Sequence, residues 1–184
     1  VDFAALGEML LQGKDNVERI EVAKKLGATK DPRAFDPLVE ALNDEDKPIR
    51  WVAIESLGDL GDKRAVPYLI KLLRKREAYR WGLRLTINAL GAIGDPSAVP
   101  DLLPFLRHED PYVRRVTTFA LGKIGSEEAL PQLIELLKDD SMVVRRWVQH
   151  SLVLLMQEKI KGEAPHDYES WLQWLNSTNH HKKP

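Results

Sequence analysis

Apolar residues recur along most of the chain at intervals of three and four residues, which is the spacing of one face of an α-helix. The pattern is clear at positions 69, 70, 72 and 73, and it returns with similar residues at positions 133, 134, 136 and 137. The two-residue alternation of a half-buried strand is absent from the sequence. The pattern therefore predicts an all-α protein built from short helices.

This helical pattern is itself repeated. A leucine at the same place in each copy returns at Leu26, Leu57, Leu90, Leu121 and Leu152, so that successive copies are 31, 33, 31 and 31 residues apart. Three copies read "ESLGDLGDKRAVPYLIKLL", "NALGAIGDPSAVPDLLPFL" and "FALGKIGSEEALPQLIELL". A unit of this length holds two short helices. Because one such unit cannot bury its apolar face alone, the units are expected to stack.

Turn and capping residues divide each unit. The segments "NDEDKP", "RHEDP" and "KDDS" lie between the two helices, and Pro48 and Pro111 suit the first turn of the second helix. Asp62 and Asp95 suit the N-caps of the following units, with Pro96 at the first helical position. These residues predict a sharp turn within each unit and a capped start for the next one.

Glycine and proline also occupy fixed places in the repeat. The glycine that follows the repeated leucine is expected to end or loosen the second helix, at Gly58, Gly91 and Gly122. The repeated proline should kink the next first helix or mark its true start, at Pro67, Pro100 and Pro131. The third unit has two extra residues between its helices and Leu83 where the other units have arginine, so its pitch should be disturbed.

The repeat resembles the HEAT-like repeats of phycobilisome lyases. The resemblance is carried by "LGxIGDPxAVPxLIxLL" and by Ile49-Arg50, Val113-Arg114 and Val144-Arg145, and it covers residues 15–157. It implies a right-handed α-solenoid, a superhelix of about five helical hairpins. For function it leaves several classes open, because the same repeat occurs in bilin lyases, in other enzymes and in interaction scaffolds.

We expect one solenoid domain over residues 1–184. The predicted helical pairs span residues 2–27, 32–60, 63–93, 96–124 and 127–160. A capping helix is predicted at 167–176, with Asp167 as its N-cap and with Trp171, Trp174 and Leu175 on one face, and residues 177–184 are predicted to form a tail.

Composition narrows the chemistry. The 184 residues are 43% hydrophobic and 30% charged, with a formal net charge of −1 and no cysteine. The absence of cysteine excludes disulfides, thiol catalysis and thiolate metal sites, and the charge balance argues against nucleic acid as the partner. No run of eighteen apolar residues occurs, so we expect a cytoplasmic protein with no membrane contact.

The candidate binding site is a stripe on the second helices, which line the concave side of HEAT-type arrays. Reading equivalent positions from unit to unit aligns arginines with large aromatic residues, and these are the residue types in which binding energy concentrates. The predicted partner-binding residues are Trp51, Glu55, Arg84, Asn88, Arg115, Phe119, Lys123, Arg146, Trp147 and His150. The alternative is that the arginines serve solubility and that Trp51 and Trp147 pack between helices.

Two further sets of basic residues are considered. A secondary basic patch could contact phosphates or an acidic partner, or be a solvated turn; it comprises Lys71, Arg74, Lys75, Arg76, Arg80 and Trp81. The repeated arginines Arg50, Arg114 and Arg145 are expected instead to tie adjacent units together. Their expected partners are turn carboxylates such as Asp44, Asp46, Asp110 and Asp140.

No catalytic or metal-binding motif stands out. His108-Glu109 is a single pair in a turn, whereas the HEAT-repeat deoxyhypusine hydroxylases, which this fold resembles, use several His-Glu pairs to hold iron. Trp51 and Glu55 are a faint match to HEAT-like alkylpurine DNA glycosylases. Nucleophile triads, phosphate-binding loops and dinucleotide fingerprints are absent. We therefore predict no metal and no cofactor.

The sequence leaves open whether the chain is an enzyme and favours a non-catalytic role. The main prediction is a monomeric interaction scaffold, or adaptor, that binds an acidic or amphipathic segment of another protein on its concave stripe. The first alternative is a bilin lyase or a lyase-like chaperone subunit. The second is a nucleic-acid-binding HEAT-like module.

Overall fold

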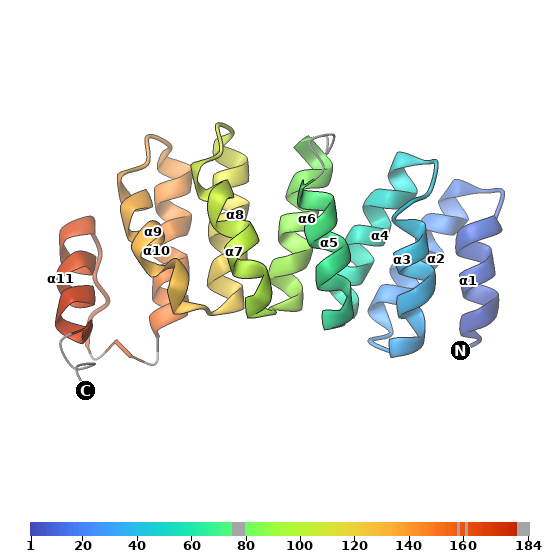
Figure 1. Ribbon diagram of the computed structural model, residues 1–184, viewed down its shortest axis with the longest axis horizontal. Helices are drawn as coiled ribbons and strands as arrows, with labels where there is room; N and C mark the ends of the chain where they lie inside the picture. Colours follow the sequence, from blue (N-terminus) through green and yellow to red (C-terminus); the bar gives the residue numbers. More distant parts are fainter. Residues whose placement is uncertain (75–79, 158, 161, 180–184) are drawn as a thin grey trace.

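A computed structural model describes residues 1–74, 80–157, 159–160 and 162–179, and this part of the chain contains helices and no strand (Figure 1). The α-helices are α1 (Phe3–Gln12), α2 (Asn16–Ala28), α3 (Phe35–Ala41), α4 (Lys47–Leu60), α5 (Val66–Arg74), α6 (Arg80–Ile93), α7 (Val99–Leu102), α8 (Pro111–Ile124), α9 (Leu130–Glu135), α10 (Met142–Met156) and α11 (Tyr168–Asn179). Short 3₁₀ turns complete the first helices, at η1 (Pro32–Ala34), η2 (Lys63–Ala65), η3 (Pro96–Ala98), η4 (Leu103–Arg107), η5 (Glu127–Ala129) and η6 (Leu136–Lys138). None of these helices combines the length and the apolar character needed to cross a membrane.

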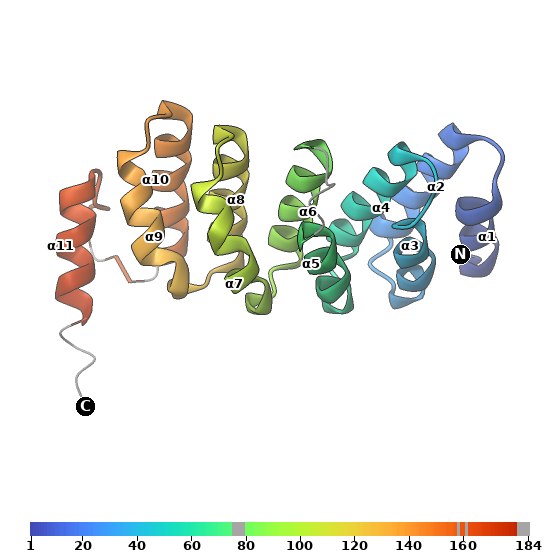
Figure 2. The same cartoon turned by 45° about the horizontal axis from the view of Figure 1, so that its top comes forward.

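The helices form two layers of a solenoid. The second helices α2, α4, α6, α8 and α10 pack side by side in one layer, and the first helices α1, α3, α5, α7 and α9 cover it (Figures 1 and 2). Packing between neighbouring units is far more extensive in the second-helix layer than in the first-helix layer. This architecture confirms the predicted all-α solenoid, and the closer spacing makes the second-helix layer its concave side.

Each new unit begins with the same local structure. The carboxylates of Asp31, Asp62 and Asp95 accept a hydrogen bond from the backbone N–H two residues later, each at 2.9 Å. A 3₁₀ turn follows, and the repeated proline is then the second residue of α5, α7 and α9. The prolines therefore mark the starts of the α-helices and do not kink them, because the N–H that proline lacks has no partner in a first turn.

Gly58, Gly91 and Gly122 were expected to end or loosen the second helices, and they do not end them. Helices α4, α6 and α8 run two residues further, and the residue after each is a second glycine, at 61, 94 and 125. Those glycines have φ of 74°, 72° and 77°, the left-handed conformation that glycine adopts without steric cost. The motif LGxxG thus contains an interior glycine and a terminating one.

The interior glycine allows neighbouring second helices to touch. A Cβ built on Gly58 would lie 2.8 Å from the Cα of Ala89 on α6, and one built on Gly91 would lie 2.7 Å from the Cα of Ala120 on α8. Both distances are below any ordinary carbon contact. Only glycine, which has no side chain, allows the two backbones to come this close where the helices cross.

The repeated arginines hold the turns inside the hairpins. Nη1 of Arg114 donates to the carbonyl oxygens of His108 and Glu109 at 2.8 and 3.0 Å. Arg50 and Arg145 make the same two bonds to the residues six and five positions before them. We call these three residues the clamp arginines, because each closes the turn of its own hairpin through backbone acceptors.

The predicted tie between units is only partly right. Arg114 also reaches the next unit, where Nε and Nη2 donate to the carboxylate of Asp139 at 2.7 and 2.8 Å. At the first hairpin, Arg19 bonds to Asp44 of the second. Asp110, by contrast, caps α8 by accepting from the N–H of Tyr112. The expected partners were misassigned because the sequence does not show which carboxylate of a turn faces the preceding unit.

The C-terminal helix covers the last hairpin, as predicted. Asp167 Oδ1 accepts from the backbone N–H of Ser170 at 2.7 Å and caps α11. Trp171 is fully buried, and its Nε1 donates to the side chain of Gln149 on α10 at 2.9 Å. The Trp174 ring lies 5.6 Å from that of Trp171, edge to face. The helix runs to Asn179, three residues beyond the predicted end.

Candidate aromatic–cationic site

The C-terminal half of the predicted stripe forms one cluster of side chains on α8 and α10. The Trp147 ring lies 5.2 Å from Phe119 and 5.8 Å from His150, in edge-to-face arrangements of 81° and 82°. All three rings are within the favourable range for aromatic pairs. Phe119 and Trp147 are half-buried, while His150 is exposed. The cluster is therefore packed on its inner side and accessible to a ligand on its outer side.

Two cations border these rings. The Arg115 guanidinium carbon lies 5.5 Å from the centre of the Trp147 ring, and the Lys123 ammonium lies 5.6 Å from that of Phe119. Both distances allow cation–π attraction. Among the residues that the structure describes, neither cation takes part in an ion pair. Their charge is therefore available to an anionic ligand. We call these five residues the aromatic–cationic cluster: Arg115, Phe119, Lys123, Trp147 and His150.

Helical periodicity explains how the cluster forms. Arg115, Phe119 and Lys123 are spaced by four residues, so they follow one face of α8. The adjoining face of that helix carries Val116 and Ala120, each one residue further along, which are buried against neighbouring helices and fix its rotation. The site is thus positioned by the packed second-helix layer and not by a loop.

The other predicted stripe residues lie along the same layer but outside these ring contacts. Trp51 is half-buried, and its Nε1 lies against the start of α6, 3.6 Å from a Cβ built on Gly82. Arg84 lies over Tyr112, with 5.9 Å between the guanidinium carbon and the ring centre. Glu55, Asn88 and Arg146 are exposed. The structure therefore brings together one half of the stripe and leaves the other half spread over α4, α6 and, for Arg146, α10.

The secondary basic patch is only partly described. Lys71 is exposed, whereas Arg74 pairs with Asp101 of the next unit, with 2.9 Å between Nε and Oδ1. Lys75 and Arg76 lie outside the described residues, as do the side chains of Arg80 and Trp81. The Arg74–Asp101 pair lowers the net positive charge of the described part of the patch.

His108 belongs to a turn. Its Nδ1 accepts a hydrogen bond from the backbone N–H of Asp110 at 3.0 Å, and its ring stacks near Phe105. Across the described part of the chain, no group of three or more His, Cys, Asp or Glu side chains converges as metal ligands would. His108 and Glu109 are thus part of the turn that precedes α8.

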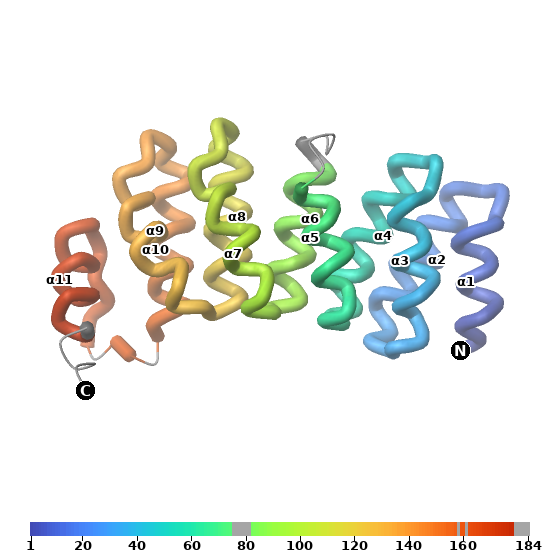
Figure 3. Tube along the Cα trace, in the orientation of Figure 1, coloured from blue at the N-terminus to red at the C-terminus, as the bar shows by residue number. Residues whose placement is uncertain are grey.

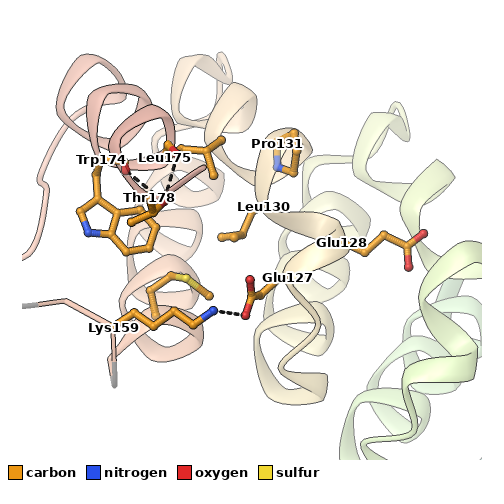
Figure 4. Close-up of a pocket in the computed structure, with 9 residues that line it drawn as sticks. Glu127, Glu128, Leu130, Pro131, Lys159, Trp174, Leu175 and Thr178 are labelled. Carbon is orange, nitrogen blue, oxygen red and sulfur yellow. Dashed lines mark hydrogen bonds and ion pairs between the residues drawn. The ribbon is translucent and has the colours of Figure 1, made fainter. Parts of the chain in front are cut away.

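A hollow beside the cap helix was not predicted from the sequence. A cavity of about 320 Å³ is lined by Trp174, Leu175 and Thr178 of α11 on one side and by Leu130 and Pro131 on the other (Figure 4). The Lys159–Glu127 ion pair crosses one end of it. Only the packing of α11 against α9 creates this space, so no local sequence signal could have shown it.

The two-layered helical array and its repeat-spaced surface residues define an α-solenoid repeat protein. A family model of HEAT repeats matches residues 3–83 and 76–153. The chain therefore belongs to the HEAT-repeat family.

Two curated relatives share part of the chain. The sequence is 44% identical to phycocyanobilin lyase subunit alpha of Microchaete diplosiphon over 78 residues, which is 38% of this chain and 26% of that protein. It is also 44% identical to the bilin biosynthesis protein PecE of Nostoc sp. PCC 7120 over 61 residues, 33% of this chain and 24% of that one. The matched part thus spans about a quarter of the length of these relatives.

Solved structures share the fold. The complex of CpcE and CpcF of phycocyanin lyase from Nostoc sp. PCC7120 matches with a TM-score of 0.70 and 24% identity, over 97% of this chain and 71% of that one. A designed armadillo repeat protein in complex with a peptide matches with a TM-score of 0.62 and 15% identity, over 94% and 99%. At these identities, the likeness is one of solenoid architecture.

The main functional prediction, a non-catalytic interaction scaffold, is contradicted by these relatives. Both curated relatives are bilin proteins, and the phycocyanin lyase complex has the same fold. They support the bilin-lyase alternative. The error arose because the solenoid alone is compatible with many functions, and the residues that separate them form no short motif.

Proposed function

We propose that this chain is a bilin-lyase-type subunit, or part of one, that binds an open-chain tetrapyrrole on its concave face. The observation that carries the proposal is the 44% identity to two bilin proteins, over 78 and 61 residues. A lyase-like chaperone that holds a bilin without transferring it fits the same observation. The substrate class in either case is a linear tetrapyrrole with propionate side chains.

The aromatic–cationic cluster has the chemistry that such a ligand needs. A bilin combines flat conjugated rings with carboxylate groups. Phe119 and Trp147 offer aromatic surface to the rings. Arg115 can bind a propionate through two parallel hydrogen bonds, and Lys123 adds a second positive charge at the other end of the cluster. These residues bind and orient the ligand in our proposal.

The absence of cysteine sets the manner of binding. Without a thiol, the chain cannot hold a bilin through a thioether bond, so the ligand is held non-covalently and can leave. Any thiol that accepts the bilin must then lie outside this chain. A protein partner is also in line with the complex of CpcE and CpcF, in which two proteins associate. We therefore include a protein partner in the proposal.

Titration of phycocyanobilin with the purified chain tests the proposal. We expect a saturable change in the visible absorption band and quenching of tryptophan emission. Arg115→Gln and Trp147→Ala should each weaken binding by about ten-fold or more, since arginine and tryptophan at a binding centre contribute about 2 kcal/mol. Arg64→Gln is the matched control, because Arg64 also lies over an aromatic ring, that of Phe35, but in the first-helix layer.

Two results would contradict the proposal. The absence of any saturable spectral change with the wild-type chain would reject bilin binding itself. Equal weakening by Arg64→Gln and Arg115→Gln would show that the bilin binds non-specifically and not at the aromatic–cationic cluster. Far-UV circular dichroism of each variant controls for loss of helical structure.

A further inference from the structure

Exposed hydrophobic side chains gather at one edge of the molecule. Among the described residues, eight large hydrophobic side chains are exposed. Three of the eight lie in the first turns of α8 and α10: Tyr112 at 57%, Met142 at 72% and Val143 at 49% exposure. We call these three the rim patch. They lie at the edge of the array where the turns of the fourth and fifth hairpins are found, the upper edge in Figures 1 and 3.

Charges flank the rim patch in a fixed order. On α10, exposed Asp140 in the turn is followed by the apolar pair and then by exposed Arg146 one turn later. On α8, exposed Glu109 is followed by Tyr112 and then by Arg115. Both helices thus present an acid, an apolar residue and a base along their axes. The clamp bonds to the backbones of Glu109 and Asp140 fix these turns, so the acids are presented by ordered backbone.

The same repeat position in the first hairpin lacks this order. Val17, 66% exposed, is the counterpart of Val143, since each lies two residues before an arginine of the repeat. Its flanks are Lys14 where the fifth hairpin has Asp140, and Ile20 where it has Arg146. The flanking charges are therefore a property of the fourth and fifth hairpins and do not follow from the repeat alone.

We propose that the rim patch binds a second copy of this chain, in a two-fold dimer with the second helices of the two copies antiparallel. An antiparallel arrangement reverses the order of charges on the facing copy, so Asp140 of each copy meets Arg146 of the other. A parallel arrangement would place acid against acid. The patch is thus complementary to itself in one orientation only, as a two-fold interface requires. Tyrosine and methionine are also residue types enriched in interfaces.

Sedimentation analysis of the purified chain without bilin tests the dimer independently of the proposed function. The apparent mass should rise from the monomer value of 21.0 kDa towards twice that value as the concentration rises to about 100 µM. Val143→Ser should weaken the dimer by about ten-fold or more, because each dimer loses the apolar contact twice. Val17→Ser, the same change at the equivalent position of the first hairpin, should leave the dimer unchanged.

Charge reversal tests the orientation. Asp140→Lys alone and Arg146→Asp alone should each weaken the dimer by about five-fold, since symmetry doubles the small effect of an exposed ion pair. The double variant should recover most of the loss, because its charges are reversed on both flanks and match again. Glu128→Lys, at the opposite edge, is the control.

The proposed dimer is refuted if sedimentation gives the monomer mass at every concentration. It is equally overturned if Val17→Ser weakens association as much as Val143→Ser does. Failure of the double charge variant to recover would overturn the antiparallel arrangement. Bilin binding is measured separately by absorbance, so loss of the dimer leaves the proposed function standing and the reverse also holds.

Discussion

Between neighbouring second helices the backbones themselves come into contact, whereas the first helices are joined by long side chains. A Cβ on Gly91 would overlap the Cα of Ala120, so α6 and α8 have no room to separate or slide without losing that contact. In the other layer, Arg64 lies 4.2 Å from the Phe35 ring and Arg33 lies 4.4 Å from the Phe3 ring. Both arginines also pair with the aspartate two residues before them.

This difference shows where the shape of the solenoid is determined. Close-packed backbone tolerates little change in volume, while exposed arginine–aromatic and arginine–aspartate pairs can rearrange at small cost. The second-helix layer therefore fixes the relative positions of α8 and α10, on which the aromatic–cationic cluster depends. The first-helix layer mainly covers the apolar side of that layer.

The largest effect is expected from filling a crossing in the second-helix layer. Gly91→Val should lower the free energy of unfolding by about 4 kcal/mol, because its side chain must displace the α8 backbone. Urea unfolding followed by circular dichroism measures the change. Ala92→Val, an exposed position next to it on α6, should cost less than about 1 kcal/mol. Similar losses for both variants would refute the special role of the crossing.

The next effect separates a clamp arginine from an arginine of the first-helix layer. Arg114→Leu, which introduces the residue type found at Leu83 in the third unit, removes the turn bonds and leaves the nearly buried Asp139 carboxylate without its partner. We expect a loss of about 3 kcal/mol. Arg64→Leu, whose pair is more exposed, should cost less than about 1 kcal/mol. If urea unfolding shows the same loss of unfolding free energy for both variants, the clamp arginine is no more important to stability than the arginine of the first-helix layer.

The smallest effect concerns pH. Burial raises the pKa of Asp139, but hydrogen bonds from Arg114 and from the backbone N–H of Ser141 outweigh it, and the pKa lies below its ordinary value. Between that lowered pKa and the unfolded value near 4, the unfolded state holds more protons, so stability rises with pH. Stability from Asp139 is thus present above about pH 4 and is lost as pH falls through the folded pKa.

Asp139→Asn removes this contribution. The slope of unfolding free energy against pH below about pH 4 should become shallower, by at most about 1.4 kcal/mol per pH unit. Asp31, whose pKa is lowered to about 2 beside Arg33, supplies the comparison in the first-helix layer. The Asp31 side chain is 28% exposed, against 6% for that of Asp139, so salt should weaken its contribution more than that of Asp139. An unchanged slope in Asp139→Asn would contradict the role of the Arg114 pair.

Much of the fold was predictable because each copy of the repeat has the same capping residues, prolines and apolar positions. The N-cap aspartates, the prolines at helix starts and the capping helix with Trp171 were all found from sequence. The role of Gly58 and its equivalents was misread, because a glycine near a helix end looks like a terminator. Only its contact with Ala89, which lies 31 residues away, reveals its function.

The candidate site was predictable in part. Four-residue spacing correctly placed Arg115, Phe119 and Lys123 on one face of α8. The contact of Phe119 with Trp147 depends on how α8 and α10 cross, and spacing within one helix does not encode it. Tyr112 was not predicted to lie on the surface, because it follows Pro111 at a helix start. The residues at the equivalent position of two other hairpins, Pro48 and Val143, are also apolar.

The sequence by itself determined the helices, their caps and the number of residues between repeated positions, since these follow from interactions between residues close in the chain. Only the tertiary structure decided which glycine separates two helices, which carboxylate each arginine meets and which half of the stripe closes into a cluster. Those outcomes depend on contacts between residues about 30 positions apart. A shift of a few tenths of an ångström where two helices cross at a glycine decides whether such contacts form. No pattern within one helix predicts that distance.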